Sequence, residues 1–421
     1  MDGMNSSYIA RNQDAFRQKS LFGFFVLIAL IPFFKTTGFD AISPALGTLC
    51  NGMLLLEATG FFLAALITFG VSPFSWAVLA FELWDYVIAV FLSGNQMPSL
   101  FYLVGTLGIV LLFDLGFRYD FGLMLDAVSF IFTVFVLCNF IIILLKPEGL
   151  SHSSNGVVYL FGLRTGSSLV VVPAIAFCVF RDSWKKRRYF SKRTLLCMAC
   201  SILTLMMQWV ATGIVELLII FTLYFLVCHF RKLKLNIWIS LLACGFLDFL
   251  IVYLRIQDIF SGFIVGFLHK DLTLSGRTYI WDAVIDSISR NPVFGYGAVS
   301  SVSMHNIQIA CHNQWLYIAH ESGYVGLVLF LIAILVSFRL VYRYRYTNLY
   351  KLFVIMTAAI LVAAVSEIQL YVPFFYALLS FPAQWKHAGS IEETTIPRLM
   401  RISWNSKRDK LFYHQPSRRL H

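Results

Sequence analysis

The sequence predicts an all-α, polytopic integral membrane protein with about 12 transmembrane helices and one large extracytoplasmic loop. Of its 421 residues, 59% are hydrophobic and only 13% are charged, and the mean hydropathy is +0.75. Soluble domains carry roughly 25% charged residues. A helix that crosses a bilayer needs about 20 consecutive apolar residues, and this chain repeats such a stretch along most of its length.

Twelve apolar stretches are expected to form the helices. Short polar or charged segments separate most of them, as expected for helices that cross a membrane in turn. They lie at about 21–34, 44–69, 74–92, 98–117, 122–145, 167–180, 195–211, 214–230, 235–254, 322–341, 352–369 and 370–385. The first and the sixth are short for a full span, and the last two could also form one broken hairpin.

The positive charges predict the orientation, because cytoplasmic loops of membrane proteins carry an excess of Lys and Arg. With the N-terminus inside, 26 of the 33 Lys and Arg residues fall on the cytoplasmic side. We therefore expect both termini in the cytoplasm. The net charge of +11 is then mainly a topology signal with attraction to anionic lipid, and it indicates no nucleic-acid partner. No cleaved signal peptide is expected, since no small-residue cleavage site follows the first apolar run.

We expect four regions in the chain, divided where its composition changes. The last of them is either a solvated tail that holds the final helix in place or a segment that lies on the inner leaflet. The regions are an N-terminal transmembrane bundle of about nine helices at 1–254, an extracytoplasmic catalytic loop at 255–321, C-terminal transmembrane helices at 322–385 and a basic cytoplasmic tail at 386–421.

The loop at 255–321 is much longer than the other connections, and long loops on a compact scaffold tend to carry function. Within it, residues 278–289 predict an amphipathic helix that ends at Asn291-Pro292. Such a helix would lie along the outer interface with its apolar face inward. The apolar face comprises Ile280, Trp281, Val284, Ile285 and Ile288.

Several common site motifs are missing from the sequence. It contains neither a nucleotide-binding GxxxxGK[ST] loop nor an Asp-x-Asp pair for a divalent metal. Most of the eight cysteines fall inside apolar runs, which predicts no disulfide framework, and Cys197 and Cys200 are interpreted as packing residues. His305, His312 and His320 have no carboxylate at ligand spacing. We therefore expect neither a metal nor a cofactor.

Arginine and histidine near the outer ends of helices remain as candidates for chemistry. Arg164 lies in GLRTGSS, Arg277 in LSGRTYIW and His312 in CHNQW. Arginine presents a planar fork of donors that suits phosphate oxygens, and a neutral histidine can accept a proton near pH 7. An arginine at a membrane edge can instead reach toward lipid headgroups. Three such groups beside glycines favour a site for a phosphorylated lipid substrate.

Three motifs in chain order resemble the signature block of the O-antigen ligase and polymerase superfamily. The members of this superfamily are bacterial membrane glycosyltransferases. The motifs are SGRTYIW, NPVFGYG and HNQWLYIAHESGYVGLVLFL, within residues 274–331. GLRTGSS is similar to an earlier arginine-containing outer segment of that superfamily. The resemblance implies a metal-independent glycosyl transfer on the outer face of the bacterial plasma (inner) membrane.

The resemblance also implies the substrates. The donor would be an oligosaccharide on undecaprenyl pyrophosphate. In a polymerase of O-antigen, capsule or exopolysaccharide, the acceptor is a second lipid-linked repeat unit, and in a ligase it is a lipid A-core sugar. Besides membrane lipids, a chain-length regulator and a flippase of the same pathway would be partners.

By the same resemblance, Arg164 and Arg277 would hold the pyrophosphate, and His312 would activate the acceptor hydroxyl. Asn313 would fix the loop of His312 or contact the sugar. Glu321 and Arg290 complete the predicted substrate-binding set. Glu321 follows His312 by nine residues, so the two would face apart on one straight helix.

A transporter or flippase is the alternative from another class of protein. It rests on acidic residues within or near the apolar stretches, because ionisable groups in a membrane are functional candidates. They are Glu57, Glu82, Asp85, Asp114, Asp126, Glu216, Asp248 and Glu367. The sequence shows no internal repeat and no helices interrupted at matched positions, so we favour the glycosyltransferase. Between its two forms we favour the polymerase, because the outer loop is modest and nothing indicates a lipid A-core acceptor.

Overall fold

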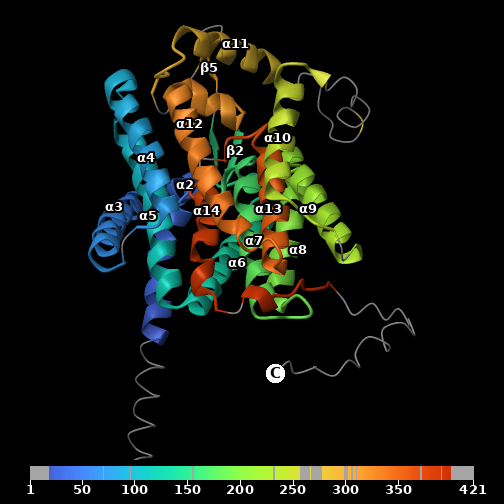
Figure 1. Ribbon diagram of the computed structural model, residues 1–421. Coiled ribbons are helices and arrows are strands. Elements are labelled where there is room, and N and C mark those ends of the chain that lie inside the picture. The colour runs from blue at the N-terminus through green and yellow to red at the C-terminus, as the bar shows by residue number, and fades with distance from the viewer. Residues whose placement is uncertain are drawn as a thin grey trace, which may run out of the picture.

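A computed structural model of the chain shows a bundle of helices with one helix lying across its end (Figure 1). The structure describes residues 19–399 except 70, 95, 154–155, 231–232, 257–265, 267–276, 298–301, 305–306, 310, 370–371 and 390.

Helices make up most of the described chain. The first is Lys19–Phe34, whose last turn, Ile31–Phe34, is a 3-10 helix. The others are α2 (Thr37–Ile42), α3 (Pro44–Ala64), α4 (Pro73–Ile88), α5 (Gln96–Tyr119), α6 (Phe121–Leu145), α7 (Gly166–Trp184), α8 (Lys192–Met207), α9 (Ala211–His229), α10 (Ile237–Val252), α11 (Arg277–Arg290), α12 (Gln314–Tyr342), α13 (Asn348–Ala363) and α14 (Phe374–Gln384).

Each of the twelve predicted apolar stretches coincides with a helix. By length and hydropathy, seven of the described helices can cross a membrane, and three shorter ones are also apolar. The two remaining predicted stretches form α8 and α14, of 16 and 11 residues. The polytopic, helical class of the protein is therefore confirmed, while twelve crossings stay a prediction.

The residues directly before three helices carry side chains that cap the helix start. The Asp120 side chain accepts a hydrogen bond from the backbone of Leu123 at the start of α6, and the Ser191 side chain accepts one from Thr194 at the start of α8. Asn313 does the same at the start of α12. A side-chain acceptor at this position satisfies one of the backbone N–H groups that a helix leaves unpaired.

α7 lies at the centre of the bundle. Residues 167–183 are all buried, although the sequence made this stretch look short for a full span. Phenylalanine rings pack around it: the rings of Phe180 and Phe381 stack with centroids 5.1 Å apart, and Phe177 meets Phe381 edge-on at 5.6 Å. A helix that is apolar on all sides is buried among other helices.

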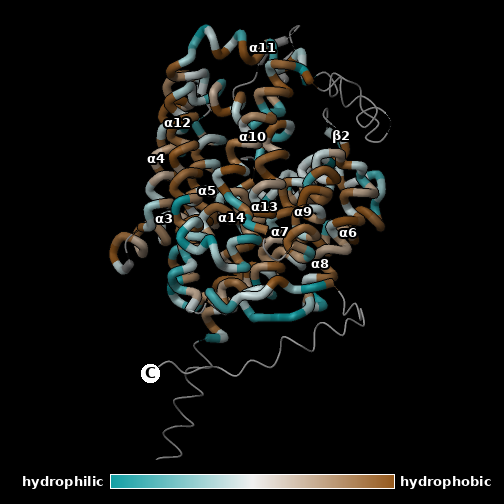
Figure 2. Tube along the Cα trace, turned by 45° about the vertical axis from the view of Figure 1, so that its right-hand side comes forward, coloured by the Kyte–Doolittle hydropathy of each residue, from teal (hydrophilic) through white to brown (hydrophobic). Residues whose placement is uncertain are grey.

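The outer helices expose large apolar side chains along their length. Leu56 in α3 and Leu242 in α10 are 77% and 73% exposed. Hydrophobic residues dominate the helices, and hydrophilic residues gather at the end that carries the α7–α8 connection (Figure 2). Exposed apolar area of this extent marks an interaction surface, and on long apolar helices it fits lipid.

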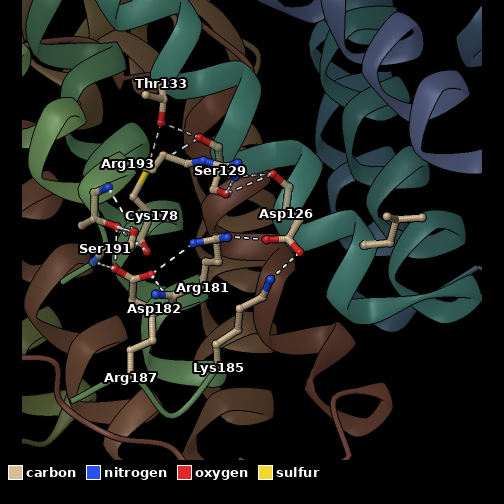
Figure 3. A network of polar contacts seen from close by, with 12 residues as sticks. Asp126, Ser129, Thr133, Cys178, Arg181, Asp182, Lys185, Arg187, Ser191 and Arg193 are labelled. Carbon is tan, nitrogen blue, oxygen red and sulfur yellow. Dashed lines mark hydrogen bonds and ion pairs between the residues drawn. The ribbon is translucent and has the colours of Figure 1, made fainter. Parts of the chain in front are cut away.

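Charged residues link α6, α7 and α8 at the end of the bundle opposite α11 (Figure 3). Asp126 pairs with Arg181 and with Lys185, whose Nζ lies 2.6 Å from its carboxylate. Asp182 accepts hydrogen bonds from the Thr194 hydroxyl at 2.7 Å and from the Ser191 backbone at 2.6 Å. These contacts give Asp126 a structural role.

The segment after α14 crosses the same end of the bundle. The Trp184 indole donates to the Ala388 carbonyl at 2.9 Å, and the Arg398 backbone N–H donates to Arg188 at 2.9 Å. The first part of the predicted tail is therefore docked on the α7–α8 connection. The last part, 400–421, lies outside the described residues.

Short strands accompany the helices, and the sequence analysis did not predict them. A three-stranded antiparallel sheet joins α6 to α7, with β1 (Ser151–Ser153), β2 (Gly156–Tyr159) and β3 (Gly162–Leu163) in that order. A second antiparallel pair, β4 (Val302–Met304) and β5 (Ile307–Ile309), lies between α11 and α12.

Within the predicted loop at 255–321, the amphipathic helix is confirmed as α11. It lies across one end of the bundle (Figure 1), and its side chains Trp281, Val284 and Ile288 are buried. The loop prediction missed the start of α12, because the chain becomes helical at Gln314, eight residues before the predicted span.

Candidate functional site

The site forms where two segments meet at the α11 end of the bundle: residues 311–314, which lead into α12, and residues 364–369 after α13. The Gln314 backbone N–H donates to the Ala364 carbonyl at 2.8 Å. In return, the Gln369 backbone N–H donates to the Gln314 side-chain oxygen at 2.7 Å. α13 ends at Ala363, so the last part of the predicted stretch 352–369 is a turn outside the helix.

Glu367 in that turn brings two predicted site residues together. Nη2 of Arg277, the first residue of α11, lies 2.7 Å from Glu367 Oε1. His312 Nδ1 lies 3.7 Å from Glu367 Oε2, an ion-pair distance longer than a hydrogen bond. The Glu367 side chain is only 10% exposed, whereas that of His312 is 36% exposed. The histidine can therefore meet a substrate while the carboxylate stays behind it.

The electrostatics of the cluster keep Glu367 ionised. Burial acts to raise the pKa of Glu367, but its contacts with His312 and the charge of Arg277 outweigh burial and lower this pKa. The carboxylate therefore persists at neutral pH, and its stabilising effect is lost only as the pH falls through that lowered value. A carboxylate facing Nδ1 favours the proton on that nitrogen, which leaves Nε2 to accept one.

The backbone of His312 is strained. Its φ is +50°, in the left-handed region that residues other than glycine seldom occupy. Such a conformation persists only where the surroundings determine it, and it occurs often at functional sites. The contacts of residues 313 and 314 provide that constraint.

Asn313 is fully buried, and protein groups engage its amide on both sides. Its side-chain oxygen accepts from the Leu316 backbone at 2.8 Å, and its nitrogen donates to Asp248 at 2.7 Å and to the Val365 carbonyl at 3.0 Å. Of the two roles predicted for Asn313, these contacts favour fixing the loop over contacting the sugar.

Arg255, three residues after the end of α10, holds the start of α11. Its guanidinium donates to the Thr278 carbonyl at 3.1 Å, pairs with Asp282 and lies 5.7 Å above the Trp281 ring. This clamp places Arg277, which directly precedes Thr278. The sequence analysis gave Arg255 no role in the site.

Arg164 lies in the turn between β3 and α7 and is exposed. Three residues later, the Ser167 hydroxyl donates to Gln208. Nearby, the Thr212 hydroxyl lies 3.5 Å from that of Ser366, beside Glu367. Arg164 is therefore at the same end of the bundle as the cluster. Among the described residues, no acidic side chain pairs with it.

Arg290 and Glu321 are not members of the cluster of Arg277, Glu367 and His312. Arg290 ends α11, about 20 Å from Arg277 by helical rise, and its exposed side chain pairs with Asp286. Glu321 is buried in α12, where its carbonyl accepts a hydrogen bond from the Gly297 backbone at 2.8 Å. The structure thus brings Arg277 and His312 into one cluster and leaves these two outside it.

α12 is broken at Gly323, and the FGYG turn docks there. With φ +65° and ψ −175°, Gly323 interrupts the helix. The backbone of Tyr296 donates to His320 at 2.9 Å, and Tyr324 donates to Pro292 at 2.7 Å. Two of the motifs that carry the family resemblance therefore meet at this break.

Gly323→Ala is expected to destabilise the protein. A left-handed conformation costs a residue with Cβ about 1–2 kcal/mol, and the added Cβ would lie 2.1 Å from the Val293 carbonyl oxygen. The unfolding temperature in detergent should fall. Gly60→Ala is the control, because nothing lies within 4 Å of its Cβ position. An equal unfolding temperature for both variants would contradict this account of the break.

The described residues contain no group of three or more His, Cys, Asp or Glu side chains that could hold a metal. His305 lies outside the described residues, and His320 is buried, with its ring stacked on Tyr296 at 4.9 Å. All eight cysteines are free thiols.

Comparisons with known proteins agree with the sequence motifs. A family profile described as O-antigen ligase matches residues 196–331. The resemblance to the O-antigen ligase and polymerase superfamily is confirmed. A candidate polysaccharide ligase of Rickettsia conorii is 25% identical over 221 residues, which cover 46% of this chain and 50% of that protein. The chain thus spans about half the length of that curated relative.

The region matched by the O-antigen ligase profile holds Arg277, His312, Asn313 and Asp248, but neither Arg164 nor Glu367. Sequence reasoning missed Glu367 as a site residue and placed it only among the acidic residues of the spans. The one sequence signal that could have marked Glu367 as a site residue was its position, as an acidic side chain, at the predicted outer end of an apolar stretch.

Proposed function

We propose that this protein assembles surface polysaccharide by glycosyl transfer from a glycan on undecaprenyl pyrophosphate to an acceptor hydroxyl. The observation that carries the proposal is the cluster of Arg277, Glu367 and His312. It joins a guanidinium suited to phosphate, a partly exposed imidazole and a buried carboxylate at one end of a membrane bundle. The family match supports the same reaction class.

In the proposed step, His312 Nε2 takes the proton of the acceptor hydroxyl while the acceptor oxygen bonds to the anomeric carbon of the donor sugar. The bond from that carbon to the phosphate oxygen breaks, and the pyrophosphate leaves with the electron pair. Glu367 stabilises the imidazolium that forms at His312, as a carboxylate does in other histidine-based sites.

Fixed positive charge must meet the growing charge on the departing pyrophosphate. Nη2 of Arg277 is held by Glu367, which leaves the other nitrogens of its planar fork for phosphate oxygens. Arg164 is the second proposed phosphate ligand, since it lies at the same end of the bundle and no described acidic residue neutralises it.

The acceptor defines two candidate functions. As a polymerase, the first candidate, the protein would use a second lipid-linked repeat unit, which fits its modest outer loop. As a ligase it would use a lipid A-core sugar. This second candidate is supported by the descriptions of both matches, which contain the word ligase.

The transporter alternative loses support from the contacts of its acidic residues. Five of the eight already accept hydrogen bonds from protein donors, so these five do not form a free path for protons or cations. Asp85 accepts from Ser322, Asp114 from Ser75, Asp126 from Lys185, Asp248 from Asn313 and Glu367 from Arg277.

We also propose that the protein lies in the plasma (inner) membrane with both termini in the cytoplasm and α11 outside. In a cysteine-free background, Tyr279→Cys should react with an impermeant thiol reagent in spheroplasts and Glu392→Cys should not. The opposite labelling result would mean that the protein has the inverted orientation in the membrane. Asp271, which the sequence also places on the extracytoplasmic side, is not among the described residues.

The test of the function is transfer by the purified protein in detergent, without a membrane potential. The substrate is undecaprenyl-pyrophosphate-linked repeat units, offered alone or with lipid A-core. Longer chains from repeat units alone identify a polymerase, and product only with lipid A-core identifies a ligase. No product from either mixture, with protein that elutes as a single folded species and with the native repeat unit, would contradict the proposal.

A further inference from the structure

Asp248 in α10 lies next to the site but outside the cluster of Arg277, Glu367 and His312. It is half-buried, and its carboxylate accepts a hydrogen bond from the Asn313 amide nitrogen at 2.7 Å. α10 packs against α13 and also contacts α12. Through Asp248, α10 therefore joins the two segments that form the site.

Asp248 is one of three groups that orient the Asn313 amide, together with the Val365 carbonyl and the Leu316 N–H. A carboxylate only accepts hydrogen bonds, so the amide nitrogen must point toward α10 and the amide oxygen toward the first turn of α12. In that orientation the oxygen accepts the Leu316 N–H at 2.8 Å and the nitrogen also reaches the Val365 carbonyl at 3.0 Å. The reversed amide would lose all three bonds.

The Asn313 amide links the segment of the proposed base to the turn that carries its carboxylate. Asn313 directly follows His312, and Val365 precedes Glu367 by two residues. The Asn313–Val365 bond therefore ties the backbone of His312 to the turn of Glu367. Because His312 holds a left-handed φ of +50°, its backbone would relax if that tie were lost.

We propose that Asp248 is a positioning residue for glycosyl transfer, which holds His312 against Glu367 through the amide of Asn313. The inference rests on the proposed function for its kinetic consequence. It assigns Asp248 no contact with substrate.

Asp248→Ala should lower kcat by about ten- to a hundredfold, the range expected for loss of a charge-assisted hydrogen bond and for a misplaced base. The KM for the lipid-linked donor should change by less than about threefold, because Arg164 and Arg277, which are proposed to bind the donor, are both kept in this variant. Asp248→Asn keeps an acceptor oxygen and should lose less activity. Asp40→Asn is the matched control, since it removes an exposed carboxylate that, among the described residues, forms its ion pair with Lys35.

An exchange of the two side chains separates positioning from general structural damage. Asn313→Asp should be strongly impaired, because two carboxylates would face each other. The double variant Asp248→Asn/Asn313→Asp restores an amide–carboxylate bond and should recover part of the lost kcat. Strictly additive effects of Asp248→Ala and Asn313→Ala, or a raised donor KM with unchanged kcat, would overturn the proposal.

Hydrogen exchange at the Leu316 amide provides a readout that needs no reaction. Asp248→Ala should speed its exchange, because the Asn313 amide would lose one of the two acceptors that hold its oxygen toward this N–H, while Asp40→Asn should not. Unchanged exchange in Asp248→Ala would overturn the positioning role even if transfer were impaired. If the wild-type protein made no product, the proposed function would fail, and the exchange result would still decide whether Asp248 holds Asn313.

Discussion

His312→Ala is expected to lower the rate of glycan transfer by about 10²–10⁴-fold, the usual contribution of a positioned general base. A sugar hydroxyl is a poor nucleophile at neutral pH, and the imidazole is the partly exposed member of the cluster with Arg277 and Glu367. The measurement is product formation by the purified variant, with binding of the lipid-linked donor measured alongside.

Donor binding should survive in His312→Ala, because the arginines that hold the pyrophosphate remain. His229→Ala is a suitable control, since this histidine ends α9 and stacks on Phe225. A transfer rate equal to wild type would exclude His312 as the base. Loss that follows only from unfolding, seen as a shifted elution volume, would also reject this role.

Arg277→Ala is expected to lower kcat/KM by about ten- to a hundredfold, since a charge-assisted hydrogen bond is worth about 1.5–3 kcal/mol. Arg277→Lys should stay badly impaired, because a lysine keeps the charge but cannot donate to Glu367 and to a phosphate from one planar fork. The structure adds a second cost in both variants, since Glu367 is buried and would lose the guanidinium that pairs with it.

The arginine variants are compared as purified proteins over a range of donor concentrations, so that KM and kcat separate. Arg345→Ala is the control, because this exposed arginine follows α12 and lies above the Tyr346 ring. Near-normal transfer by Arg277→Ala would mean that this arginine only reaches toward lipid headgroups. Arg164→Ala should raise donor KM, with a smaller expected effect because no described contact fixes its side chain.

Local signals in the sequence were sufficient to predict most of the helices, but not α2 or the start of α12. Runs of apolar residues predicted the twelve stretches that form helices, and spacing of Trp281, Val284 and Ile288 predicted α11 with its buried face. Three motifs predicted the family resemblance, which the comparisons confirm. These features depend on residues close together in the chain, so sequence alone determines them.

Local signals were weaker where backbone geometry departs from regular helix. The sequence places glycines at 295, 297 and 323, but only the packing shows that Gly323 breaks α12 so that the FGYG turn can bind its carbonyls. Likewise, the start of α12 at Gln314 depends on the Asn313 cap and on its contacts with residues 364–369.

The composition of the site was decided by the tertiary structure. Arg277 and His312 were predicted from their chemistry, but nothing in the sequence pairs them with Glu367, which lies 90 residues from Arg277. Likewise, the sequence analysis listed Asp248 only among the acidic residues of the apolar stretches and gave Arg255 no role in the site. A single polar residue near the end of an apolar stretch is not part of a periodic pattern, so the sequence does not indicate which residue it will contact. The pairing depends on which helix ends meet when the bundle packs, and burial there makes each charge require a partner.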